Sequence, residues 1–156
     1  MHPLDRAVLN VWRLKLGMVA GVATLGTLAY EVLNLFDGDL PLPFGLTTAL
    51  VLAAGLALCL IVPPLRYRFW RYALRPEELY LERGLFNRVR TIVPLRRIQH
   101  LDVSQDVIER EFGLGRLVVH TAGARSSEIV LPGLRYEEAE KLRDAMKRYI
   151  LEEDVV

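Results

Sequence analysis

The sequence predicts an α+β protein in which an N-terminal two-helix transmembrane hairpin precedes a small antiparallel β domain closed by a C-terminal helix. Two long apolar runs lie before residue 64. The residues that follow alternate between apolar and polar with a period of two, and the C-terminal segment repeats apolar residues at helical spacing. We therefore expect a tail and hairpin at 1–64 and a β domain at 65–156.

Apolar residues make up 52% of the 156 residues and are concentrated in the first part of the chain. Charged residues are sparse there and frequent afterwards, so the composition indicates a membrane part followed by a water-facing part. The charged residues up to position 64 are Asp5, Arg6, Arg13, Lys15, Glu31, Asp37 and Asp39.

The two apolar runs, at about 14–36 and 44–63, are each long enough to cross a bilayer. A hydrocarbon core of about 30 Å requires about 20 helical residues. The first run also has the basic start of a signal peptide, but it is long for one and no small-residue cleavage site stands out after it. We therefore favour a retained anchor over a cleaved signal.

Basic residues flank both runs on the side away from the connecting turn. The turn carries only Asp37 and Asp39. Because positive charge is retained in the cytoplasm, both termini are expected there, in a multi-pass protein of the cytoplasmic membrane. The flanking cations are Arg6, Arg13 and Lys15 before the first run and Arg66, Arg68, Arg71 and Arg75 after the second.

Glu31 is the one acidic residue inside a predicted span. At 1.5 Å rise per residue it lies about 24 Å beyond Lys15, which places it near the outer interface. A buried polar contact with another helix is the alternative. A transport pathway would require further ionisable residues, which the two runs do not supply.

Small residues in the first run suggest close helix packing. Gly17 and Gly21 have the four-residue spacing that lets helices approach, and Gly26 follows them. Packing within the hairpin and contact with another subunit both account for this pattern.

The second half of the chain predicts six short strands. A short helix capped by Ser104 or Asp106 and ending at Gly113 interrupts them. A final helix at about 136–151 carries an apolar stripe that would cover a sheet, formed by Ala139, Leu142, Met146 and Ile150. The predicted strands are 67–74, 78–84, 87–95, 97–105, 116–123 and 126–133.

The run "PLRRIQHLDVSQ", followed by "ER", "GLG" and "TAG", resembles the bacterial PH domain of the YdbS-like membrane proteins. The resemblance extends over about 66–150, and the preceding hairpin matches the layout of that family. It implies a PH-like β-barrel or sandwich with a C-terminal helix on a bacterial membrane hairpin, and no known reaction. Related proteins often carry several such modules, which implies assembly among them.

No catalytic, cofactor-binding or metal-binding residues are predicted, and we expect a protein that is not an enzyme. His100 and His120 lie on predicted strands, where a role on the sheet surface is the simpler interpretation, and Cys59 is the only cysteine. "GLGRLV" lacks the third glycine of a dinucleotide-binding loop. Nucleic acid is not an expected partner, because the basic stretch carries no aromatic ribonucleoprotein motif.

The leading hypothesis is an interaction scaffold that self-associates or assembles with related bacterial PH-domain membrane proteins. Its sheet edges could accept a strand from a partner. The alternative is binding of anionic lipid headgroups through Arg66, Arg68, Arg71 and Arg75, although some of these residues simply set the topology. A small oligomeric channel is the third hypothesis.

Overall fold

The computed structural model describes residues 1–35, 42–84, 87–122 and 128–153. Its contacts divide the chain into two units. One is Trp12–Pro64, and the other combines Met1–Val11 with Leu65–Val156. Each unit is described below by itself.

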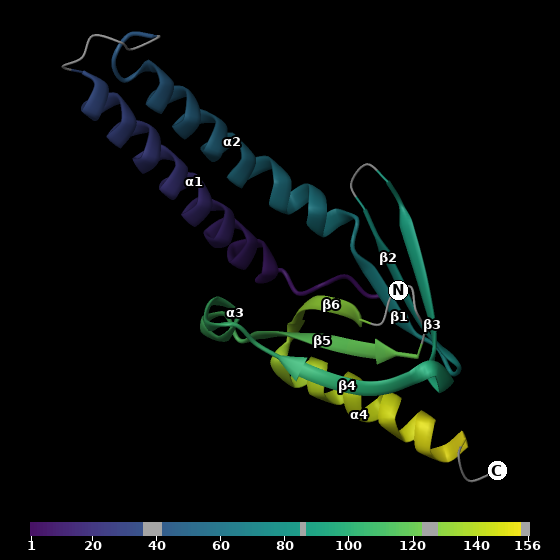
Figure 1. Cartoon of the computed structure of the whole chain (residues 1–156). Coiled ribbons are helices and arrows are strands. Elements are labelled where there is room, and N and C mark those ends of the chain that lie inside the picture. Colours follow the sequence, from purple (N-terminus) through teal and green to yellow (C-terminus); the bar gives the residue numbers. More distant parts are fainter. Residues whose placement is uncertain (36–41, 85–86, 123–127, 154–156) are drawn as a thin grey trace. The chain divides into compact units, whose positions relative to one another are not determined.

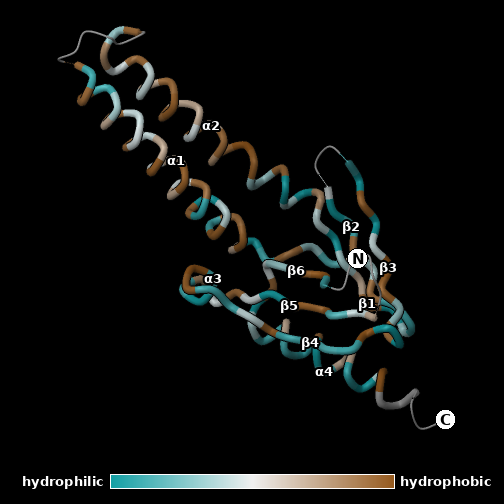
Figure 2. The backbone as a smooth tube through the Cα atoms, viewed as in Figure 1, coloured by the Kyte–Doolittle hydropathy of each residue, from teal (hydrophilic) through white to brown (hydrophobic). Residues whose placement is uncertain are grey.

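The first unit is built on two long helices, α1 (Val8–Asn34) and α2 (Leu46–Arg68) (Figure 1). Figure 2 shows α2 as mostly hydrophobic and α1 as a mixture of hydrophobic and intermediate residues with some hydrophilic ones. Within the most apolar 18-residue stretch, only 6% of α1 and 11% of α2 is buried. The core helix of a soluble domain is, by contrast, mostly buried. The predicted acidic turn with Asp37 and Asp39 lies outside the described residues.

Both helices extend beyond the apolar runs. Asp5 caps the start of α1, since its carboxylate accepts a hydrogen bond from the Ala7 N–H at 2.7 Å. At the other end, α2 continues through Pro63 and Pro64 to Arg68. Proline costs a helix hydrogen bonds, but its fixed φ is compatible with helical backbone. The strand predicted at 67–74 consequently begins only at Arg71.

Six strands form two antiparallel sheets, ordered β1-β2-β3 and β4-β5-β6. The α+β class with a C-terminal helix is therefore confirmed, whereas no ladder closes the two sheets into a barrel over the described residues. The elements are β1 (Arg71–Leu74), β2 (Glu78–Arg83), β3 (Val89–Pro94), the 3-10 turn η1 (Leu95–Arg97), β4 (Ile98–Ser104), α3 (Val107–Glu111), β5 (Leu114–Thr121), β6 (Glu128–Arg135) and α4 (Tyr136–Glu153).

The helix α4 runs along the β4-β5-β6 sheet (Figure 1). Two residues of its predicted apolar stripe, Ala139 and Met146, are fully buried. Leu117 and Val119 of β5 and Leu131 of β6 are also at 0% exposure, so the apolar core lies under this helix and sheet. Burial of each such side chain contributes about 1.5–3 kcal/mol.

The N-terminal tail, grouped with the hairpin in the sequence prediction, makes its contacts with the strands instead. Leu4 and Val8 are each only 2% exposed. His2 forms a two-way backbone bridge with Tyr72 of β1, and Asp5 donates its N–H to the Gly133 carbonyl of β6 at 2.8 Å. Gly133 has φ +68°, and a Cβ there would lie 2.6 Å from the Val8 side chain. Only glycine suits this position.

Candidate functional site

Glu31 closes one end of the hairpin by accepting hydrogen bonds from the first turn of α2. Its carboxylate accepts from the N–H groups of Gly45 (3.0 Å), Thr47 (3.1 Å) and Thr48 (3.4 Å) and from the Thr48 hydroxyl (2.9 Å). These N–H groups have no partner inside the helix, and a carboxylate suits the positive end of the helix dipole. The structure shows the buried polar contact with another helix, while the expected position near the outer interface stays a prediction.

Among the described glycines of the two helices, the most closely approached is Gly55 of α2, not a glycine of α1. A Cβ at Gly55 would lie 2.7 Å from the Ala20 Cβ. A Cβ at Gly17 would just reach Cys59 at 4.0 Å, and one at Gly21 or Gly26 would meet nothing within 4 Å. Within the described part of the hairpin, Gly21 and Gly26 therefore do not contact α2, and the role of Gly55 was not predicted.

The four candidate lipid-contact arginines differ in their surroundings. Arg66 and Arg68 occupy the last turn of α2 and are exposed. Arg71 donates to the Trp70 carbonyl at 3.3 Å. Arg75 forms an ion pair of 2.7 Å with Glu78 and stacks over the Tyr80 ring at 5.0 Å.

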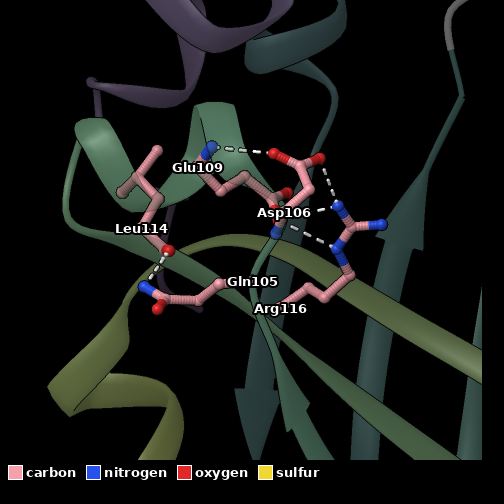
Figure 3. Close-up of polar contacts among 5 residues, drawn as sticks. All are labelled: Gln105, Asp106, Glu109, Leu114 and Arg116. Carbon is pink, nitrogen blue, oxygen red and sulfur yellow. Dashed lines mark hydrogen bonds and ion pairs between the residues drawn. The ribbon is translucent and has the colours of Figure 1, made fainter.

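A partly buried polar cluster holds α3 against β5 (Figure 3). Asp106 and Glu109 form the predicted cap, because each carboxylate accepts the other residue's backbone N–H, at 2.8 and 3.0 Å. Arg116 bonds both carboxylates at 2.7 Å, and the hydrogen bond with Glu109 is the main reason that its pKa is raised. Gln105 completes the cluster by donating to the Leu114 carbonyl at 2.6 Å. The cluster explains how α3 is held and leaves no free group for chemistry.

His100 and His120 face each other across β4 and β5, with ring centroids 5.9 Å apart. Asp102 lies between them, 2.9 Å from His100 Nε2 and 3.3 Å from His120 Nε2. A role for this carboxylate was not predicted, although its two-residue spacing from His100 places both side chains on one face of the strand. Among the described residues, no group of three His, Cys, Asp or Glu is placed to hold a metal ion.

A groove of about 450 Å³ is lined by residues of β4 and α4. Its apolar lining comes from Ile98 and Leu101 of β4 and Ile150 of α4. Polar side chains border this lining on both elements, namely Gln99, His100, Arg143, Asp144 and Lys147. An apolar floor with a polar border can accept the alternate side chains of an extended peptide.

The family model described as Bacterial PH domain matches residues 17–150, which includes most of the hairpin as well as the strands. This chain belongs to the bacterial PH domain family. The resemblance inferred from the sequence is thereby confirmed.

Two curated proteins of Bacillus subtilis (strain 168) are similar to this bacterial PH domain protein. The UPF0699 transmembrane protein YdbS is 32% identical over 140 residues, which cover 90% of this chain and 86% of YdbS. The UPF0699 transmembrane protein YdbT is 30% identical over 83 residues, which cover 53% of this chain and 17% of YdbT. No solved structure matches the chain significantly. With its two apolar helices, the chain is a membrane-associated member of the family.

Proposed function

We propose that this chain is a non-enzymatic, membrane-anchored scaffold that assembles with itself or with related bacterial PH-domain membrane proteins. The observation that carries the proposal is the small-residue flank of α1, on which Gly21 is exposed and faces no described part of α2. Gly17 and Gly21 share one flank by their four-residue spacing, and nothing lies within 4 Å of a Cβ at Gly21. Small residues at such a surface let a second transmembrane helix approach closely.

The proposed site of action is the cytoplasmic face of a bacterial inner membrane, with both termini inside. The loop-charge asymmetry supports this orientation. The match to YdbT supports assembly among related chains, because the same module recurs there as 17% of a longer transmembrane protein. The polar clusters at Glu31 and Arg116 serve helix caps, which supports a role other than catalysis.

Headgroup binding remains the second candidate, supported by Arg66 and Arg68 at the end of α2. Juxtamembrane cations are worth about 1 kcal/mol each near anionic lipid. Arg75 contributes less to this candidate, because Glu78 already neutralises it. The channel hypothesis has little support, because the Glu31 carboxylate is already engaged by donors from α2.

The test is a mass measurement on the full chain after gentle extraction from its native membrane, with identification of whatever copurifies. We expect a defined oligomer or a recurrent PH-domain partner. Gly21→Leu should reduce that complex, whereas Val19→Leu, on an exposed position about half a turn away, should preserve it. A lone chain carrying only anionic lipid would overturn the scaffold and favour headgroup binding.

A further inference from the structure

The two sheets have four edge strands, and three of these edges are protected. The edge of β1 is bridged by His2, and β6 carries Pro132 and is capped by the Asp5 N–H. The edge of β3 ends in Pro94 and displays the exposed Arg90. Covering segments, prolines and cations are the usual means by which proteins prevent strand pairing at an edge.

The remaining edge, that of β4, is open. This strand has seven residues and contains no proline, lysine or arginine. Along its outer side the backbone has no hydrogen-bond partner in the part of the chain that the structure describes. Gln99, His100, Asp102 and Ser104 are exposed. An edge of this kind presents unpaired N–H and C=O groups to another strand.

The groove beside β4 would receive the side chains of an added strand. Alternate residues of a strand point to the same face, so every second side chain of the newcomer would lie over Leu101 and Ile150. Main-chain hydrogen bonds would hold the added strand, and the groove would accept its apolar side chains.

We propose that the occupant is a second copy of this chain, paired antiparallel through β4 about a two-fold axis at Leu101. This inference rests on the proposed function, and it names the surface through which self-assembly occurs. The β4-β5-β6 sheet of one copy and the β4-β5-β6 sheet of the other would then form one continuous sheet. The two Leu101 side chains would meet beside the grooves.

The charges on β4 favour this register over the two adjacent ones. A two-fold axis perpendicular to the sheet must pass through a residue, because directly opposite side chains lie on the same face. An axis at Leu101 places His100 opposite the partner's Asp102. An axis at Asp102 would oppose two carboxylates, and like charges directly opposite are destabilising. An axis at His100 would leave the Asp102 carboxylate without a histidine opposite it. The pairing of β4 with β5 is irregular only between Ile98 and His100. Residues 100–102, which form the three central pairs of the proposed dimer, therefore lie in the regular part of β4.

The first experiment is cysteine crosslinking of the full chain in its membrane, in a Cys59→Ala background that removes the only cysteine. Leu101→Cys should form a disulfide-linked dimer on mild oxidation, because directly opposite Cβ atoms lie about 4.5–5.5 Å apart. Ser104→Cys is the matched control from the same strand. Its two copies would lie about 20 Å apart along the strands and should remain uncrosslinked.

A charge exchange provides an independent readout. His100→Asp should reduce dimer formation several-fold by opposing two carboxylates. The double variant His100→Asp, Asp102→His restores opposite partners and should recover the dimer. Both residues are exposed, so neither change threatens the apolar core.

Equal crosslinking of Leu101→Cys and Ser104→Cys would overturn the pairing, because it would indicate random collision. A defined native complex without Leu101→Cys crosslinking would also overturn it, while the scaffold function would stand. If Leu101→Cys instead crosslinks to another protein, the edge binds a foreign strand and the proposed occupant is wrong. Absence of both complex and crosslink would overturn the function together with the inference.

Discussion

Glu109 shows how hydrogen bonds and an ion pair can offset the desolvation penalty of a buried carboxylate. It is 6% exposed, yet its carboxylate accepts from the Asp106 N–H and from two nitrogens of Arg116. Buried polar groups are tolerated when they are hydrogen bonded, and their removal leaves the former partners unsatisfied. The same reasoning applies to Glu31 and the first turn of α2.

Glu109→Ala should lower the free energy of unfolding by about 1–3 kcal/mol, because it removes the reciprocal half of the capping box and leaves Arg116 without its main partner. Glu111→Ala, an exposed position at the end of the same helix, should change it little. Denaturant titration of the detergent-solubilised chain would measure both. Equal effects of the two substitutions would contradict a specific role for the cluster.

The pH dependence of stability should contain a contribution from Tyr72. Burial, reinforced by the negative charge of Glu138, raises the pKa of this phenol. Because the folded-state pKa exceeds that of the unfolded chain, the stabilisation is complete below about pH 10 and is lost as the pH rises past it. Thermal melting between neutral and alkaline pH should therefore show a steeper loss for the wild type than for Tyr72→Phe. Parallel curves would contradict this prediction.

At the scale of elements, the hairpin is packed at one close contact and capped at one end. Gly55 allows α2 to approach Ala20 of α1, while Glu31 binds the N-terminus of α2. In a bilayer there is no hydrophobic drive to bring helices together, so close packing and hydrogen bonds must supply the attraction.

Gly55→Ala should destabilise the hairpin, because the new Cβ would lie 2.7 Å from the Ala20 Cβ and force the helices apart. The double variant Gly55→Ala, Ala20→Gly removes the clash and should recover most of the stability. Gly26→Ala, which meets nothing within 4 Å, is the control. Thermal unfolding in detergent would compare them. A Gly55→Ala chain as stable as Gly26→Ala would show that this contact is unimportant.

At the scale of the whole molecule, the N-terminal tail covers two edges of the β domain, those of β1 and β6. The tail precedes the hairpin in the chain, yet His2 and Asp5 bond to β1 and β6. Asp5 also pairs with Arg135 at 2.9 Å. The β domain is therefore discontinuous in sequence, and β4 is left as the open edge on which the proposed pairing depends.

Periodicity and capping signals within short segments were enough to predict the two apolar helices, the six strands and the stripe on α4, and to narrow the cap of α3 to Ser104 or Asp106. Each of these features depends on residues close together in the chain. The functional predictions that rest on Gly17, Gly21, Gly26 and the four arginines stay predictions.

Long-range contacts were decided only in the tertiary structure. Asp5 and Arg135, His100 and His120, and Ala20 and Gly55 meet because the chain folds back on itself. No periodic pattern specifies which distant residues become neighbours. Sequence could therefore predict that sheet edges exist, but only the folded chain shows that three are protected and that β4 lies open beside a groove.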